Sequence, residues 1–149
     1  MSKKKSDIKR GNIDVSDLED LPEEHEFRIA RYFADRGKNV RFIQRSNIPG
    51  VHSPDLYMDG LNWEMKSPIG DGKHTVEHIF RKAMDQSKYV IIDLRRCKME
   101  ESRAIKEFAA IFNKKPRMRK MLIIKKNESY WNIQSNTIVL LTKSQNMVL

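Results

Sequence analysis

The stretch Pro54–Lys66 contains the feature that most limits how this chain folds, the dipeptide Asp59-Gly60. A two-residue hairpin turn of type I′ needs a positive φ at both central residues, and Asp-Gly meets that need. The turn sets the register of the strands on either side of it, which places residue 55 opposite residue 64. Side chains alternate between the two faces of a strand. One face of the hairpin is therefore apolar, with Leu56, Met58, Leu61, Trp63 and Met65 on it.

The opposite face of the hairpin brings two carboxylates together. Asp55 lies across from Glu64, and Lys66 follows two residues later. The Cβ atoms of such a pair are roughly 5 Å apart, and like charges there are destabilising. Mg²⁺ binds one or two carboxylates together with water and phosphate oxygens, so we expect Mg²⁺ or Mn²⁺ at Asp55 and Glu64, with Lys66 activating water or steadying a phosphate. The alternative is a solvated face on which Lys66 only neutralises Glu64.

The overall charge indicates a polyanionic partner. Lys and Arg number 29 against 20 Asp and Glu, a net charge of +9 that favours nucleic acid or an anionic surface. The single cysteine excludes an intrachain disulfide framework and fits a reducing, cytoplasmic location. The sequence has no apolar run of about 18 residues, so no membrane span is expected. We expect residues 1–17 to be a flexible basic arm and residues 18–149 to be a single domain.

The remaining pattern alternates helices with strands. The first helix is expected over Pro22–Arg36, capped by Asp20, with Glu26 on or beside its apolar stripe. The other expected elements are a strand over residues 39–45, the hairpin, a helix capped by Thr75, a strand over residues 89–94, a helix over residues 100–114, and strands over residues 121–124, 130–133 and 137–141. The fold class is therefore α/β, with a mixed sheet flanked by helices.

The order helix, three strands, helix, strand resembles a known family. Pro54-Asp55 on the second strand and Glu64-x-Lys66 on the third are similar to the motif of the PD-(D/E)xK nuclease superfamily, which has the restriction-endonuclease-like fold. The resemblance covers about residues 22–95 and implies an αβββαβ core, here with an extra C-terminal helix and strands. It implies a catalytic set of Glu26, Asp55, Glu64 and Lys66, with metal at Asp55 and Glu64. It implies a further polar residue at Gln86.

A narrower resemblance concerns residues 53–96. This block is similar to the C-terminal nuclease domains of bacterial contact-dependent inhibition toxins, several of which act on tRNA. That resemblance implies nucleic-acid contacts near the site from Lys73, His74, Thr75 and Arg81, and it makes an immunity protein a candidate partner. The chain shows no delivery region, so we expect a stand-alone relative or an excised domain. Restriction-type nucleases often dimerise, which makes a homodimer a second candidate.

Three functions fit this sequence. The favoured one is a Mg²⁺-dependent endonuclease that cuts phosphodiester bonds of RNA or DNA. The second is a metal-independent toxin-type ribonuclease that works through Lys66, His74 and Arg81, because a histidine near neutrality serves as an acid or base. The third is a nucleic-acid-binding module that keeps the fold without cutting. His25, His52 and His78 are expected on the surface, and no His/Cys spacing indicates zinc.

Overall fold

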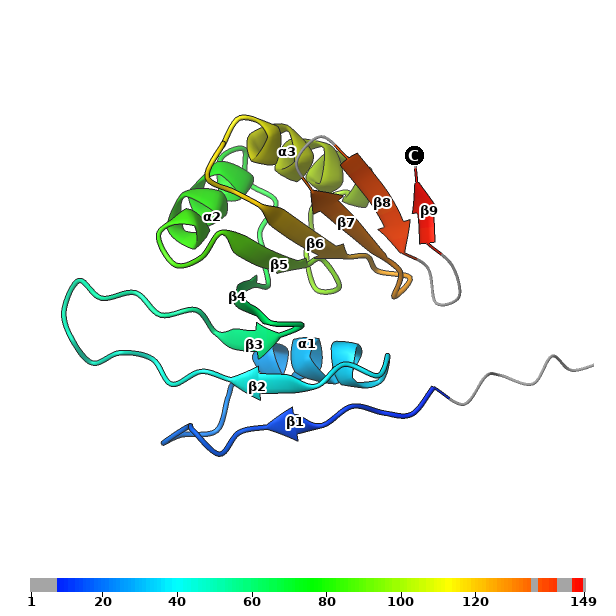
Figure 1. Cartoon of the computed structure of the whole chain (residues 1–149). Coiled ribbons are helices and arrows are strands. Elements are labelled where there is room, and N and C mark those ends of the chain that lie inside the picture. Colours follow the sequence, from blue (N-terminus) through cyan, green and yellow to red (C-terminus); the bar gives the residue numbers. More distant parts are fainter. Residues whose placement is uncertain (1–7, 135–136, 142–145, 149) are drawn as a thin grey trace, which may run out of the picture.

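The computed structural model describes residues 8–134, 137–141 and 146–148, with side chains through residue 134. Three helices and nine strands follow one another in this part of the chain (Figure 1). They are β1 (Ile13–Asp14), α1 (Glu24–Ala34), β2 (Val40–Phe42), β3 (Leu56–Met58), β4 (Leu61–Lys66), α2 (Thr75–Met84), β5 (Tyr89–Asp93), α3 (Glu101–Asn113), β6 (Lys120–Ile124), β7 (Tyr130–Gln134), β8 (Thr137–Leu141) and β9 (Asn146–Val148). The predicted α/β class, with a mixed sheet, is confirmed.

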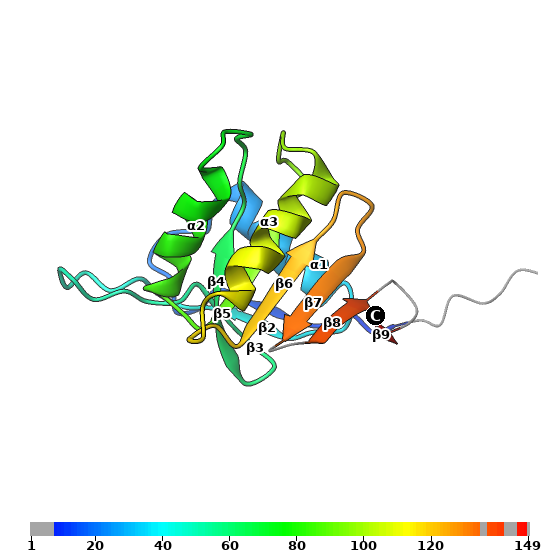
Figure 2. The same cartoon turned by 90° about the horizontal axis from the view of Figure 1, so that it is seen from above.

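The strands form one sheet in which spatial order follows chain order, from β1 to β9. β1 and β2 are parallel, as are β4 with β5 and β5 with β6, whereas the remaining neighbours are antiparallel. Helices α2 and α3 supply the two crossovers between the parallel strands β4, β5 and β6, since parallel neighbours need long connections. In Figures 1 and 2, α2 and α3 lie on one face of the sheet and α1 lies on the other.

Two apolar clusters, one on each face, hold this layered arrangement together. Val90 and Ile92 of β5 pack with α2 and α3, through Phe80 and Phe108 among others. Ile91, between them in sequence, packs on the opposite face with the α1 cluster. This alternation explains why β5 is a continuous apolar run, because both of its faces are covered. Within the described residues, no helix is long and apolar enough to span a bilayer.

The hairpin has the register expected from its turn. Leu56 pairs with Trp63, Tyr57 with Asn62, and Met58 with Leu61. Asp59 and Gly60 have φ angles of 54° and 76°, as a turn of type I′ requires. Tyr57, on the polar face, is 40% exposed, whereas Trp63, on the apolar face, is 1% exposed. The apolar face of the hairpin is therefore the buried one.

Trp63 anchors this hairpin to the α1 side of the core. Its indole Nε1–H donates to the carbonyl of Met58 at 3.0 Å, and its ring packs 5.7 Å from that of Tyr89. We expect Trp63→Ala to reduce the free energy of unfolding by about 3–5 kcal/mol, as for other buried aromatic residues. Urea denaturation measures this change. Tyr57→Ala, on the exposed face of the same hairpin, is the control, and it is expected to cost less than about 1 kcal/mol. Equal losses for both variants would contradict the packing described here.

Several expected boundaries were wrong, because local capping chemistry competes with periodicity. Helix α1 begins at Glu24, not Pro22, and its N-cap is Glu23, not Asp20, since the Glu26 carboxylate accepts the Glu23 backbone N–H at 3.1 Å. His74, not Thr75, is the N-cap of α2. β2 covers only three of the seven residues expected. The strands β1 and β9 were not predicted.

The expected arm at the N-terminus is only partly described. Residues 1–7 lie outside the described residues. Further on, Ile13 pairs with Val40 in a short parallel ladder, and Gly11 donates its N–H to the carbonyl of Ala34 at 2.8 Å. This portion of residues 1–17 is thus bound to the sheet and to α1. The division into an arm and a single domain stays a prediction.

Candidate active site

The predicted carboxylate pair lies where β4 changes partners. Leu61–Trp63 pair with β3, and from Glu64 onward β4 pairs with β5, beginning at Glu64 opposite Val90. Asp55 directly precedes β3 and stays bonded to β4 on both sides of Glu64: its backbone N–H donates to the carbonyl of Trp63 at 2.8 Å, and its carboxylate Oδ2 accepts the N–H of Met65 at 2.8 Å. These two contacts hold Asp55 beside Glu64, and both carboxylates line one cleft.

Both carboxylates are buried, which makes their charges costly. Asp55 is 9% exposed and Glu64 is 2% exposed. Burial, followed by the repulsion from Asp55, raises the pKa of Glu64 to about 8 from an ordinary 4.5, although Lys66 opposes this shift. The Lys66 ammonium nitrogen lies 2.8 Å from Glu64 Oε1. A perturbed carboxyl beside a second acid and a lysine is typical of a functional site.

Gln86 completes the surroundings of Glu64. It follows α2, and its amide nitrogen, once it faces the carboxylate, donates to Glu64 Oε2 at 2.6 Å and also contacts Oε1. The polar position suggested by the family resemblance therefore lies against the acidic pair. Because it holds the Glu64 side chain in place, Gln86 is a positioning residue in this geometry.

The cleft around the pair has a volume of about 410 Å³. Four of its lining residues, Asp55, Glu64, Lys66 and Gln86, were predicted from the sequence. The others were not predicted as site residues. Its lining residues are Arg45, Ser46, Val51, His52, Ser53, Asp55, Glu64, Lys66, Lys82 and Gln86. A second hollow of about 330 Å³ adjoins it, because Arg45 and Asp55 line both, and Glu26 of α1 lies in this second hollow.

The structure does not bring the other predicted contacts to this cleft. Lys73, His74 and Thr75 lie at the start of α2, whereas Gln86 follows its last residue, and a ten-residue helix is about 15 Å long. Arg81 pairs with Glu77 at 3.2 Å and lines a different hollow, between α2 and α3. Nucleic-acid contacts at these four residues stay a prediction, since a polymer substrate extends well beyond the bond that is cut.

Arg45, Lys82 and His52 are the site residues that sequence reasoning missed. Lys82 had a signal, since it precedes Gln86 by four residues and therefore shares a side of the helical segment with it. His52 was expected on the surface and is exposed, yet it lines the cleft. Arg45 had no local signal, because its place depends on α1, β3 and the end of β2 together.

The donor set fits one hard divalent ion of the Mg²⁺ type. The described residues contain no cluster of three His, Cys, Asp or Glu side chains arranged for a metal. Two adjacent carboxylates are nevertheless sufficient for Mg²⁺, whose remaining positions are usually filled by water and phosphate oxygens. Asp55 and Glu64 would hold the ion.

The fold and this cleft define a mixed α/β domain with a buried acidic pair, and comparison with known proteins assigns it to a family. The chain belongs to the contact-dependent growth inhibition CdiA C-terminal domain family, which it matches over residues 52–130. This match includes Asp55, Glu64, Lys66 and Gln86, and it makes the chain a toxin domain by family. No curated protein matches the chain.

A solved structure shares the fold. It is described as a CdiA-CT/CdiI toxin and immunity complex from Burkholderia pseudomallei, and the similarity has a TM-score of 0.55 at 16% identity. The aligned part covers 83% of this chain and 99% of that chain. With the family match, the contact-dependent inhibition relationship expected from residues 53–96 is confirmed, whereas membership of the PD-(D/E)xK superfamily stays a prediction.

Proposed function

We propose that this chain is a toxin that cuts nucleic acid with the help of a divalent metal ion. The observation that carries the proposal is the buried pair Asp55 and Glu64 with the Lys66 ammonium 2.8 Å from Glu64. The family relationship supports a toxic activity, and the net charge of +9 supports a polyanionic substrate. We propose tRNA as the first substrate to test, and the cytoplasm as the compartment in which the toxin acts.

Each residue of the cleft has a chemical role in this proposal. A metal ion bound at Asp55 and Glu64 would lower the pKa of water and offset charge on the phosphate. Lys66, beside Glu64, orients the attacking water and stabilises charge that develops on the phosphate oxygens. Gln86 keeps Glu64 turned towards the cleft. Lys82 contributes a further positive charge at the wall where a phosphate backbone would pass.

The test is cleavage of total tRNA and of plasmid DNA by the purified protein. With Mg²⁺ or Mn²⁺ we expect one of the two polymers to be cut, and with EDTA we expect neither to be cut, because the carboxylates alone supply no Lewis acid. Gel electrophoresis of the products measures this directly. Intact polymers in both metals would contradict the proposal.

A metal-independent ribonuclease is the second candidate, and the same assay separates it. That candidate requires Lys66, His74 and Arg81 to act together, whereas His74 and Arg81 both pair with Glu77 and neither lines the cleft that contains Lys66. We therefore expect Lys66→Ala to reduce cleavage by about 100-fold or more and His74→Ala to leave it within about twofold. Cleavage in EDTA that His74→Ala abolishes would favour the ribonuclease. Salt-sensitive binding without cleavage would favour a binding module.

We also propose a cognate immunity protein as a partner. The similar structure from Burkholderia pseudomallei is a toxin and immunity complex. Co-expression with a protein encoded beside this chain, followed by co-purification, tests that proposal. A homodimer stays a prediction from the sequence.

A further inference from the structure

Arg45 lies between the acidic pair and a third carboxylate. It follows β2 by three residues, and its Nη2 atom is 2.9 Å from Glu26 Oε1 and 3.8 Å from Asp55 Oδ1. Its side chain is 73% exposed although both carboxylates that it approaches are largely covered. Arg45 also lines both hollows of the site. A guanidinium group is therefore held at the edge of the acidic pair with most of its surface open to a ligand.

Both carboxylate oxygens of Glu26 accept hydrogen bonds from groups outside the acidic pair. Oε2 accepts the backbone N–H of Glu23 at 3.1 Å, which stabilises the first turn of α1. Oε1 accepts from Arg45 at 2.9 Å. Within the described part of the chain, Glu26 does not join Asp55 and Glu64 in a three-ligand cluster. The contacts of Glu26 are those of a residue that fixes the helix start and one arginine.

We propose that Arg45 binds a non-bridging oxygen of the substrate phosphate and that Glu26 acts through Arg45 as a positioning residue, not as a metal ligand. This inference rests on the proposed nuclease function. A guanidinium presents several donors in a planar fork that suits a phosphate. The contacts of Arg45 with Glu26 and Asp55 use its Nη2 atom. The 3.8 Å distance to Asp55 Oδ1 places the guanidinium beside the two proposed metal ligands. A phosphate bound to a metal ion at Asp55 and Glu64 would lie beside this guanidinium.

The charge of Arg45 makes a distinctive prediction for metal binding. A cation 3.8 Å from Asp55 competes with a divalent ion for that carboxylate. Arg45→Ala is therefore expected to keep or strengthen Mn²⁺ binding, by up to about tenfold, while it reduces kcat/KM by about 100-fold through loss of a phosphate contact. Arg45→Lys keeps the charge without the fork and is expected to restore cleavage only in part. A residue that merely supported the fold would not separate these two quantities.

The experiment has two parts. Mn²⁺ is titrated into each protein and the free ion is measured by electron paramagnetic resonance, and cleavage kinetics are measured on the same proteins. It uses the wild type, Arg45→Ala, Arg45→Lys, Glu26→Gln and the double variant Arg45→Ala/Glu26→Gln. Arg41→Ala is the matched control, because Arg41 lies on β2, the strand that precedes Arg45, and pairs with an aspartate, Asp17, at 2.8 Å outside the site. Thermal melts establish that each variant is folded.

The double variant decides the role of Glu26. In the Arg45→Ala background, Glu26→Gln is expected to change neither Mn²⁺ affinity nor kcat/KM by more than about twofold, because its effect needs the arginine. A tenfold loss of Mn²⁺ affinity in that background would make Glu26 a metal ligand and overturn the inference. Arg45→Ala cleaving as well as Arg41→Ala would overturn it too, while leaving the nuclease proposal intact. A wild type that neither binds Mn²⁺ nor cuts would overturn both.

Discussion

Glu64→Gln is expected to abolish cleavage and at the same time to stabilise the protein at alkaline pH. The lost carboxylate is one of the two proposed metal ligands, so cleavage is expected to fall by about 1,000-fold or more. The amide has nearly the same shape and leaves Asp55 without a like charge in the same cleft. Substitution of an ordinary buried residue lowers the free energy of unfolding. Glu64→Gln is instead expected to lower activity while it raises stability at alkaline pH.

The stabilisation depends on pH in a direction set by the raised pKa. Because the folded protein holds the Glu64 proton up to a pKa of about 8 and the unfolded chain releases it near 4.5, the folded state binds more protons between these values. The wild-type free energy of unfolding therefore falls as pH rises through this window. Glu64→Gln removes that loss, so its melting temperature in EDTA is expected to exceed that of the wild type by roughly 3–10 °C at pH 8.5.

Melting curves at pH 5 and pH 8.5 with EDTA measure this difference. The two proteins are expected to be nearly equal at pH 5, where Glu64 is protonated when folded. Glu77→Gln, at an exposed position on α2, is the control and is expected to change the melting temperature little at either pH. A Glu64→Gln variant that is less stable than the wild type at pH 8.5 would contradict the charge repulsion described for the acidic pair.

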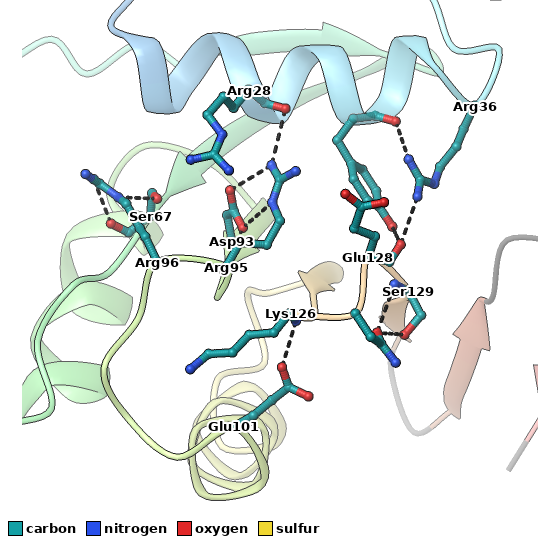
Figure 3. A network of polar contacts seen from close by, with 12 residues as sticks. Arg28, Arg36, Ser67, Asp93, Arg95, Arg96, Glu101, Lys126, Glu128 and Ser129 are labelled. Atoms are coloured by element: carbon teal, nitrogen blue, oxygen red, sulfur yellow. Dashed lines mark hydrogen bonds and ion pairs between the residues drawn. The ribbon is translucent and has the colours of Figure 1, made fainter.

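Arg95→Ala is expected to be among the most destabilising single substitutions in the chain. Figure 3 shows Arg95 against Asp93, which is 4% exposed at the end of β5. Arg95 Nε and Nη2 donate to the two Asp93 carboxylate oxygens, each at 2.9 Å, and Nη2 also donates to the carbonyl of Arg28 on α1 at 3.2 Å. Removing the guanidinium leaves a buried carboxylate with its backbone donor but no counter-charge.

The expected loss is about 3–5 kcal/mol, the range seen when one partner of a buried ion pair is removed. Urea denaturation measures it. The double variant Asp93→Asn/Arg95→Met is expected to recover much of the loss, because neither side then carries a buried charge. Arg103→Ala, which breaks the exposed pair with Glu107 on α3, is the control and is expected to cost less than about 0.5 kcal/mol. A loss for Arg95→Ala as small as for Arg103→Ala would show that Asp93 is readily solvated.

The hairpin and the acidic pair were predictable from sequence because one local turn determines them. Asp59-Gly60 sets the register, and the two-residue alternation then separates Trp63 from Glu64. The burial of Glu64 was not predictable in the same way, since it arises from the covering segment that carries Gln86. Arg45 depends on long-range packing even more, because it meets Glu26 and Asp55 only when α1, the end of β2 and the start of β3 come together.

The distance of the predicted contact residues from the cleft has a simple geometric cause. His74 and Gln86 are only twelve residues apart in sequence, but α2 is straight and carries the start of the helix away from the cleft. Proximity along the chain was therefore a poor guide to proximity in space. The short strand β1 was missed because two residues give no periodic pattern, and its parallel partner β2 lies beyond α1 in the chain.

The most direct test of the central claim is a calorimetric titration of Mn²⁺ into the wild type and into Asp55→Asn at pH 7.5. Asp55 is chosen because its side chain keeps the Met65 contact as asparagine and loses only its charge. If the two carboxylates hold a divalent ion, the wild type binds one Mn²⁺ per chain and the variant binds it at least about tenfold more weakly. Absence of binding by the wild type, or equal binding by both proteins, would contradict the claim that this acidic pair is a metal site.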